Sequence, residues 1–347
     1  MIMDSFFSKA LISWYQEHQR FLPWRCTSDP YAIWISEIIL QQTRVAQGLD
    51  YYNRFMARFP DVETLAQASE DEVLLYWQGL GYYSRARNLH FAAHQIVEQG
   101  GFPKTYEGVR ALKGVGDYTA AAISSIAYGL PYAVVDGNVY RVLSRVFGVD
   151  IPIDSTQGKK YFAQLAQELV DVDAPGLYNQ SIMDFGALQC VPKSPNCDAC
   201  PLQDRCVAHA QHKVDVLPVK SHKTKVTHRY FHYLNVRIGD EMLLHQRKAD
   251  DIWKNLYEVP LVEADHRMSV DELTQTTLFR QLACNQIQLV KEQVKHVLSH
   301  RVIFADLYIL SASRWPSPLP AGYFKLKVSD LGHYAISRLM DIILQEK

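Results

Sequence analysis

Four cysteines within one short stretch constrain this chain more than any other feature. The stretch "GALQCVPKSPNCDACPLQDRC" spans residues 186–206, and only two further cysteines occur in the 347 residues. The four clustered cysteines are Cys190, Cys197, Cys200 and Cys206. Three structures would use four thiols in this way: a pair of disulfides, a zinc site, or an iron–sulfur cluster.

The N-terminal sequence bears on the choice, because disulfides persist only in oxidising compartments. The opening "MIMDSFFSKALISWYQEH" has no basic segment before an apolar block, so it does not resemble a signal peptide. There is also no run of eighteen apolar residues that would span a membrane. We therefore predict a protein of the reducing cytoplasm, where clustered cysteines more often hold metal. The spacing C-x6-C-x2-C-x5-C has one short pair, which favours an iron–sulfur cluster and leaves zinc open.

The charge balance does not by itself indicate nucleic-acid binding. The chain has 36 Lys+Arg and 37 Asp+Glu, a net charge of −1. Residues 1–215 have 18 Lys+Arg against 23 Asp+Glu, which leaves 36 − 18 = 18 against 37 − 23 = 14 in the remainder. If the N-terminal part binds DNA, it must use local backbone donors and a few well-placed cations.

The chain length predicts two or three domains. Residues 1–215 have the pattern of successive helices, including "DVETLAQASEDEVLLYWQGL" with Asp61 and Ser69 as N-caps and "GDYTAAAISSIAYG" ending at Gly129. Residues 212–230 have no helical period and read as a solvated linker. Alternating apolar residues then predict short strands of a mixed sheet with accompanying helices. These strands are expected at 230–238, 241–248, 256–264 and 304–310. We expect an all-α N-terminal part joined to a smaller α+β domain.

A glycine turn offers a candidate phosphate site. In "LKGVGDYTAAA", residues 112–122, the turn precedes a helix, whose N-terminal N–H groups favour an anion. The residues of this candidate are Gly114, Val115 and Gly116. An ordinary turn between two helices is the alternative.

Two carboxylic acids are candidates for catalysis. Glu37 lies among isoleucines in "WISEIILQQTRV", and burial favours the protonated form that a general acid needs. Asp136 begins a helix in "VVDGNVYRVLSR", where it would cap the helix or hold an anionic oxygen near a developing cation. An exposed helical glutamate and a simple cap are the alternatives. An acid and a carboxylate together suit glycosidic chemistry.

These motifs resemble a known family. Together with "LPWR" (22–25), "GLGYYSRARNLH" (79–90) and the cysteine loop, residues 1–215 are similar to the helix-hairpin-helix DNA glycosylases with a [4Fe–4S] cluster. Within these they resemble the MutY-type adenine DNA glycosylases. The resemblance implies a helical catalytic region over 1–215, a linker over 216–229 and a Nudix-like lesion-recognition domain over 230–347. In the catalytic region, 26–133 would form the six-helix module, and 1–25 with 134–215 the cluster module.

The resemblance also implies residue roles. Glu37 would protonate adenine N7, Asp136 would stabilise or capture the oxocarbenium-like sugar, and Asn138 would assist Asp136. The base must leave the stacked duplex to reach these groups. The pocket for the flipped adenine would contain Trp24, Arg25 and Gln180. The residues that work on the opposite strand would be Gln42, Thr43 and Tyr82, with Tyr82 wedged beside the lesion.

Tyr118 distinguishes subfamilies. Endonuclease III-like relatives have a lysine directly after "GVGD", and that amine forms a Schiff base in a lyase reaction. A phenol cannot form an imine, so we expect hydrolysis of the base without efficient lyase activity.

The C-terminal part resembles the Nudix-like domain through "LLHQRKADDIWKNLYEVPLVE" (243–263). The clustered glutamates of a catalytic Nudix box are missing, since "SVDELTQTTLFRQLACN" has only Glu272. "HVLSHRVIF" (296–304) matches the family's lesion-reading loop with Ser299 and His300, although Leu298 stands where phenylalanine is usual. The expected lesion is 8-oxoguanine.

The expected protein is a monomeric adenine glycosylase without efficient lyase activity, acting on duplex DNA that contains adenine opposite 8-oxoguanine or guanine. Replication or mismatch-repair proteins are possible partners, and no membrane is involved. Three alternatives stay open: a glycosylase for another mismatch such as G:T, a non-catalytic iron–sulfur DNA-binding protein, and an unusual Nudix hydrolase.

Overall fold

The computed structural model describes residues 2–221 and 226–345, which fall into two compact units. The first unit is Met1–Ala66 with Phe91–Lys223, and the second is Gln67–His90 with Thr224–Lys347. Residues 67–90 are thus grouped by their contacts with the C-terminal residues. The domain boundaries expected from the sequence, at 1–215, 216–229 and 230–347, stay a prediction. Over the described ranges, every helix is too short or too polar to cross a bilayer.

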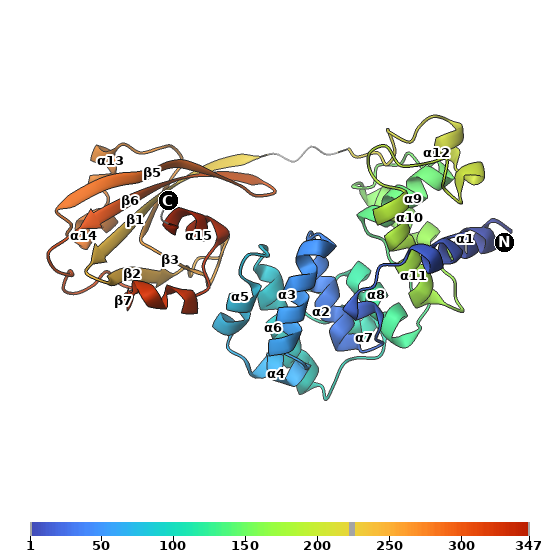
Figure 1. Cartoon of the computed structure of the whole chain (residues 1–347), viewed down its shortest axis with the longest axis horizontal. Coiled ribbons are helices and arrows are strands. Elements are labelled where there is room, and N and C mark those ends of the chain that lie inside the picture. Colours follow the sequence, from blue (N-terminus) through green and yellow to red (C-terminus); the bar gives the residue numbers. More distant parts are fainter. Residues whose placement is uncertain (1, 222–225, 346–347) are drawn as a thin grey trace. The chain divides into compact units, whose positions relative to one another are not determined.

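The first unit is helical (Figure 1). Its helices are α1 (Ile2–His18), α2 (Pro30–Leu40), α3 (Val45–Arg58), α4 (Val62–Gln67, ending at the unit boundary), α7 (Tyr106–Arg110), α8 (Asp117–Tyr128), α9 (Gly137–Phe147), α10 (Thr156–Leu169), α11 (Pro175–Asp184) and α12 (Val207–Ala210). Short 3-10 or π turns occupy Pro23–Arg25, Phe185–Gln189 and Gln203–Arg205.

Helix ends in this unit follow the capping residues of the sequence. Asp29 and Asp136 accept backbone hydrogen bonds at the starts of α2 and α9, and Ser155 does so for α10. Helix α8 ends at Gly129, whose φ of 66° is left-handed and suits glycine. The expected helix over "GDYTAAAISSIAYG" is therefore confirmed.

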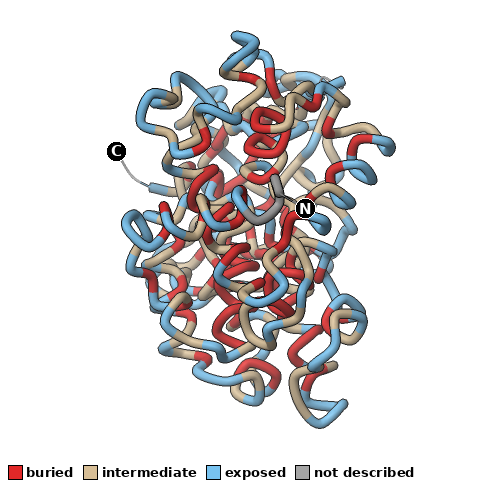
Figure 2. The backbone as a smooth tube through the Cα atoms, turned by 90° about the vertical axis from the view of Figure 1, so that its right-hand side faces the viewer, coloured by how far each residue is buried: buried red, intermediate tan, exposed pale blue. Residues whose placement is uncertain are grey.

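The core of the first unit joins distant parts of the chain. Phe7, Leu11 and Trp14 of α1 share one buried cluster with Val142 of α9 and Phe162 of α10. Figure 2 shows such buried positions on the inner sides of the helices, with exposed positions in the loops. N-terminal helix α1 therefore packs with helices that follow residue 136.

The segment expected to be a solvated linker is in part ordered against the first unit. Leu217 is buried and its carbonyl accepts from Arg145 Nε at 3.1 Å. The Ile153 N–H donates to the Val219 carbonyl at 3.0 Å. The first strand begins at Thr227, within the range read as linker. The charged residues Lys213, Asp215 and Lys220 are exposed, as expected of a solvated surface. The backbone groups of Leu217, Val219 and Thr227 are nevertheless hydrogen-bonded to other parts of the chain.

The second unit contains a seven-stranded mixed sheet. Its strands are β1 (Thr227–Ile238), β2 (Glu241–Gln246), β3 (Tyr257–Glu258), β4 (Leu261–Ala264), β5 (Gln286–Val297), β6 (Arg301–Ser311) and β7 (Tyr323–Lys327). Its helices are α5 (Glu70–Trp77), α6 (Ser84–Glu98, which crosses the unit boundary), α13 (Val270–Thr274), α14 (Thr277–Leu282) and α15 (Arg338–Leu344), with a 3-10 turn at Val328–His333.

Strand order is β3-β2-β1-β6-β5, with β4 paired to β1 and β7 to β2. β1 and β6 run parallel and the remaining pairs are antiparallel. The sheet was expected, but the sequence reasoning missed β5 and β7. β5 lies at the edge, is largely exposed and contains register shifts, so its alternation is weak.

Residues 67–90 pack onto this sheet unit through polar contacts. Tyr257 Oη donates to Asp71 Oδ2 at 2.8 Å, and the Ile336 N–H donates to Gln78 Oε1 at 3.0 Å. Ser69 caps α5, as expected, by accepting from the Glu72 N–H. These contacts place the turn before α6 beside the strands of the same unit.

Candidate active site

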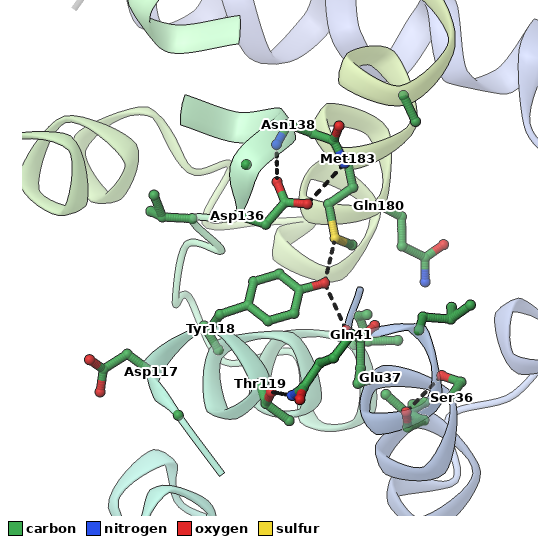
Figure 3. A pocket seen from close by; sticks show the side chains of 18 of the residues that line it. Ser36, Glu37, Gln41, Asp117, Tyr118, Thr119, Asp136, Asn138, Gln180 and Met183 are labelled. Carbon is green, nitrogen blue, oxygen red and sulfur yellow. Dashed lines mark hydrogen bonds between the residues drawn. The ribbon is translucent and has the colours of Figure 1, made fainter. Parts of the chain in front are cut away.

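A cavity of ≈ 1190 Å³ in the first unit brings together both candidate acids. Its lining includes Glu37 from α2, Tyr118 from α8, Asp136 before α9 and Gln180 from α11. Figure 3 shows Tyr118 reaching into the space between Glu37 and Asp136. Residues that range from Glu37 to Gln180, a span of more than a hundred positions, thus supply one site.

Glu37 lies in α2, where residues 31–39 are all buried. Its side chain is 8 % exposed. Burial raises the pKa of Glu37 to about 7, the Tyr118 hydrogen bond and Arg25 oppose the rise, and the nearby Asp136 charge adds to it. The burial expected from the sequence is confirmed. A carboxylic acid with this pKa is part protonated at neutral pH and suits proton donation.

Tyr118 is the direct partner of Glu37. Its Oη donates to Glu37 Oε2 at 2.7 Å and lies 3.1 Å from Met183 Sδ (Figure 3). Burial, followed by the charges of Glu37 and Asp136, raises the pKa of Tyr118 well above its usual value. The phenol therefore stays protonated and acts as a hydrogen-bond donor.

Asp136 is held by the start of α9. Its Oδ1 accepts from the N–H groups of Asn138 and Val139, both at 2.8 Å, and its Oδ2 accepts from Asn138 Nδ2 at 2.9 Å. Burial raises the pKa of Asp136, whereas these hydrogen bonds and Arg141 favour the anion. Asp136 thus caps α9, as one reading expected, and the residue also lines the cavity.

Asn138 is fixed by groups that sequence reasoning missed. Arg141 Nη2 donates to Asn138 Oδ1 at 2.9 Å, and Arg141 Nε donates to the Cys190 carbonyl at 2.7 Å. A Cβ on Gly186 would lie 2.6 Å from Asn138 Cβ, so only glycine fits there. Arg141 lies one helical turn after Asn138, a spacing that could have suggested their contact.

The expected adenine-pocket residues share the cavity with a buried ion-pair cluster. Trp24, Arg25 and Gln180 all line the cavity. Arg25 Nη2 donates to Asp184 Oδ1 at 2.7 Å, and Arg20 also pairs with this fully buried carboxylate. Sequence reasoning missed Arg20 and Asp184. The signal was a polar residue four positions after Gln180, on the same face of α11.

Gln180 is oriented from the opposite side of the pocket. Its Oε1 accepts from Tyr15 Oη at 3.0 Å, and Arg25 Nη1 donates to the same hydroxyl at 3.2 Å. Tyr15 lies in α1 and is buried. The Tyr15 hydroxyl therefore links the side chains of Gln180 and Arg25, a contact that the sequence did not indicate.

The residues expected to work on the opposite strand divide between the units. Gln42 and Thr43 line the cavity of the first unit, and Gln42 has a φ of 59°. In the second unit the hydroxyls of Tyr82 and Ser299 are hydrogen-bonded. Tyr82 is 47 % exposed with a φ of 46°. Non-glycine residues in this backbone region cluster at functional sites.

The glycine turn precedes α8 as expected. Gly114 has a φ of 78°, Gly116 is the N-cap of α8, and both line the cavity. The Val115 side chain is buried, and its N–H donates to the Leu112 carbonyl at 3.1 Å. Val115 thus closes the turn, and a phosphate would meet the N–H groups that follow it.

The four clustered cysteines meet around one cavity, where Arg145 also lies. All six cysteines belong to the described residues and are free thiols, so the paired disulfides do not form. Arg145 Nη1 lies 3.5 Å from Cys190 Sγ, a cation suited to an anionic cluster. Within 2–221 and 226–345, no three His, Cys, Asp or Glu side chains form a group for a metal ion. Thiols that share a cavity still fit a [4Fe–4S] cluster, whose four irons span more space than one ion.

Three family models match the chain. Residues 35–171 match the HhH-GPD superfamily base excision DNA repair protein, residues 190–206 match the iron–sulfur binding domain of endonuclease III, and residues 232–346 match the NUDIX domain. An adenine DNA glycosylase of Buchnera aphidicola (Baizongia pistaciae) is 31% identical, over 87% of this chain and 84% of that protein. The chain belongs to the adenine DNA glycosylase family. The cysteine loop accordingly holds the family's [4Fe–4S] cluster.

Other relatives extend this result. A second Buchnera adenine DNA glycosylase (Acyrthosiphon pisum) is 33% identical, over 73% of each chain. The rat adenine DNA glycosylase is 44% identical over 61% of this chain, but the chain spans only 44% of the rat protein's length. The structure of a thermostable thymine-DNA glycosylase matches with a TM-score of 0.56 and 28% identity, over 60% of this chain and 97% of that chain. The family and the helical fold thus agree with the expectation.

Proposed function

We propose that this chain is a base-excision-repair DNA glycosylase that hydrolyses the N-glycosidic bond of adenine opposite 8-oxoguanine, or guanine, in duplex DNA. The observation that carries the proposal is that Glu37 and Asp136 line one cavity but have different hydrogen-bond partners. Glu37 accepts from the Tyr118 side chain, whereas Asp136 accepts from two backbone N–H groups and the Asn138 side chain. Family membership supports the same activity.

The two acids have complementary parts in the reaction. Glu37, part protonated at neutral pH, transfers its proton to adenine N7, so the base leaves with the electron pair of the glycosidic bond. Positive charge then develops on the sugar, and the Asp136 carboxylate stabilises it or bonds to C1′. Water then adds its hydroxyl to C1′, which releases the Asp136 carboxylate if it has bonded there, and the proton of the water goes to the Glu37 carboxylate. Asn138 holds Asp136 in the orientation that this requires.

The remaining cavity residues bind the flipped base and the backbone. Trp24, Arg25 and Gln180 receive the adenine, and the turn of Gly114, Val115 and Gly116 grips a phosphate at the start of α8. Gln42, Thr43, Tyr82, Ser299 and His300 are assigned to the opposite strand. Ser299 presents a hydroxyl that would hydrogen-bond 8-oxoguanine at the atoms that distinguish it from guanine.

Tyr118 supports hydrolysis without a lyase step. Its phenol donates to Glu37 and offers no amine for a Schiff base. The [4Fe–4S] cluster held by Cys190, Cys197, Cys200 and Cys206 supplies shape to the loop 190–206. The partners of the chain are expected to be damaged duplex DNA in the cytoplasm and replication or mismatch-repair proteins.

Thymine opposite guanine is a second candidate substrate. The structural match to a thymine-DNA glycosylase favours it, and Tyr118 is compatible with it. The Nudix-like C-terminal residues favour the adenine reaction.

The decisive experiment uses duplexes with one adenine opposite 8-oxoguanine or opposite guanine, and one thymine opposite guanine. Excess cluster-loaded protein is incubated with each labelled duplex, and half of each sample receives alkali before electrophoresis. Breakage of the adenine strand only after alkali is the expected result. Breakage without alkali would show that a lyase step takes place. Breakage of the thymine strand alone would show that thymine, and not adenine, is the substrate. Asp136→Asn should bind the duplex and leave it intact.

A further inference from the structure

The turn between β5 and β6 has a fixed backbone and exposed side chains. The Leu298 N–H donates to the Arg301 carbonyl at 2.8 Å, which closes the turn. The His300 carbonyl accepts from the Thr227 N–H at 3.0 Å, which ties the turn to β1. Ser299 and His300 are exposed. The turn therefore presents a hydroxyl and an imidazole on a backbone held from two sides.

A carboxylate lies behind this turn. Asp251 Oδ1 accepts from Arg301 Nη1 at 2.6 Å, and Asp251 Oδ2 accepts from Arg229 Nη1 at 2.5 Å. Partial burial favours the neutral acid, but these two hydrogen bonds outweigh it and lower the pKa of Asp251 to about 2. Asp251 is consequently an anion that bridges the residue after His300 and a residue of β1.

A buried arginine, Arg247, braces the loop of Asp251, and its Nη2 lies 3.8 Å from Asp251 Oδ2. The Arg247 N–H donates to the Leu256 carbonyl at 2.9 Å, and Arg247 Nε donates to the Ile252 carbonyl at 3.2 Å. Arg247 Nη1 donates to Glu258 Oε1 at 2.8 Å. Arg247 is only 8 % exposed. The loop that carries Asp251 is thus braced on the sheet, and Asp251 provides a fixed point for Arg301.

We propose that Asp251 is a positioning residue for lesion discrimination, which through Arg301 holds Ser299 and His300 in register with the base opposite adenine. The proposal rests on the proposed function and makes Asp251 act without touching DNA. Without this carboxylate, Arg301 would lose its ion-pair partner, whereas Arg229 would keep Glu263. Arg301, whose side chain is 37% exposed, would then be free to pair with a DNA phosphate. Such contacts add affinity without sequence or lesion information.

The test compares Asp251→Asn with Asp250→Asn. Asp250 is the adjacent residue, its side chain is 94% exposed, and it pairs only with Lys254 among the described residues. Single-turnover excision is measured on adenine opposite 8-oxoguanine and opposite guanine. We expect Asp251→Asn to lower the ratio of the two rates about tenfold, because losing a charged hydrogen bond has about that effect. Asp250→Asn should keep the wild-type ratio.

A second variant keeps the proposal testable if Asp251→Asn does not fold. Arg301→Gln removes the same contact from the other side, and should lower the ratio to a similar extent. The double variant should lose little more than either single variant, because both remove one interaction. Binding to undamaged duplex provides a readout besides activity. Asp251→Asn should steepen the dependence of log affinity on log salt by about one phosphate contact, whereas Arg301→Gln should not.

Three outcomes would overturn the inference. An unchanged rate ratio in folded Asp251→Asn and Arg301→Gln would show that the contact does not position the turn. Equal slowing on both duplexes would show a general structural role. Wild-type protein that excises adenine from neither duplex would refute the proposed function as well, and so is distinguishable from failure of the inference alone.

Discussion

Replacing Glu37 with glutamine should inactivate the protein and stabilise it at alkaline pH. The amide cannot donate a proton to adenine N7, but its oxygen can still accept from Tyr118 Oη, which is 2.7 Å from Glu37 Oε2. The substitution therefore removes the ionisable group and keeps the side-chain volume and the hydrogen bond with Tyr118. If the protein without the acid is more stable, then the buried carboxylate destabilises the fold and is kept for its function.

The magnitude follows from the pKa of Glu37, which burial raises from 4.5 to about 7. Because the folded pKa is the higher one, the folded state binds more protons between these values, and stability falls as pH rises through this window. A difference of about 2.5 units corresponds to about 3 kcal/mol, of which about 2.5 kcal/mol is lost between pH 5 and pH 8. Glu37→Gln does not suffer this loss.

The assay is urea unfolding of both proteins at pH 5, 6, 7 and 8, starting in each case from protein with a full complement of cluster. The stability difference should grow in favour of Glu37→Gln by about 2–3 kcal/mol from pH 5 to pH 8 and level off above the folded pKa. Glu17→Gln, an exposed residue of α1, is the matched control and should show no such trend. A difference between wild type and Glu37→Gln that does not vary with pH would refute the buried-acid reasoning.

Three further predictions concern neighbours of the acids. Tyr118→Phe removes the hydrogen bond that lowers the pKa of Glu37, so the alkaline limb of the single-turnover rate should move to higher pH by about one unit. An unmoved limb would show that Tyr118 does not influence the pKa of Glu37. Gly186→Ala places a Cβ 2.6 Å from Asn138 Cβ and should slow excision by about tenfold or more. Gly137→Ala, whose added Cβ would meet nothing within 4 Å, should not slow excision. Equal rates for the two variants would show that Asn138 can move without loss of activity. Asp184→Asn leaves Arg25 and Arg20 without their buried counter-charge and should cost about 3–5 kcal/mol in unfolding experiments, and an effect no larger than that of the exposed Asp173→Asn would refute the pairing.

Much of the helical framework was accessible from the sequence, because its signals are local. Asp136 caps α9 through the backbone N–H groups of Asn138 and Val139, and Gly129 ends α8 in the left-handed region. Burial of Glu37 followed from its apolar neighbours in α2. Each of these features depends on residues within one or two helical turns, which a single sequence displays directly.

Apart from the Asn138–Arg141 contact, which spans one helical turn, the missed features depend on contacts between distant residues. Arg20 pairs with Asp184 across 164 positions, and nothing near either residue indicates the partner. β5 is recognisable only from its pairing with β6, since most of its side chains are exposed. Asp251 likewise gains its partners from β1 and β6. A single sequence contains no signal for such pairings until the sheet or the helical core is built.

The two acids could not have been given opposite roles from burial alone, because burial raises the pKa of both. The difference lies in the donors that surround each carboxylate. Asp136 accepts three hydrogen bonds at the N-terminus of α9, two of them from backbone N–H groups. Among the described residues, Glu37 accepts from the Tyr118 phenol alone. Hydrogen bonds to the charged form and the positive end of a helix both favour an anion. One cavity can therefore hold a proton donor and a carboxylate together, which supports the donor role proposed for Glu37.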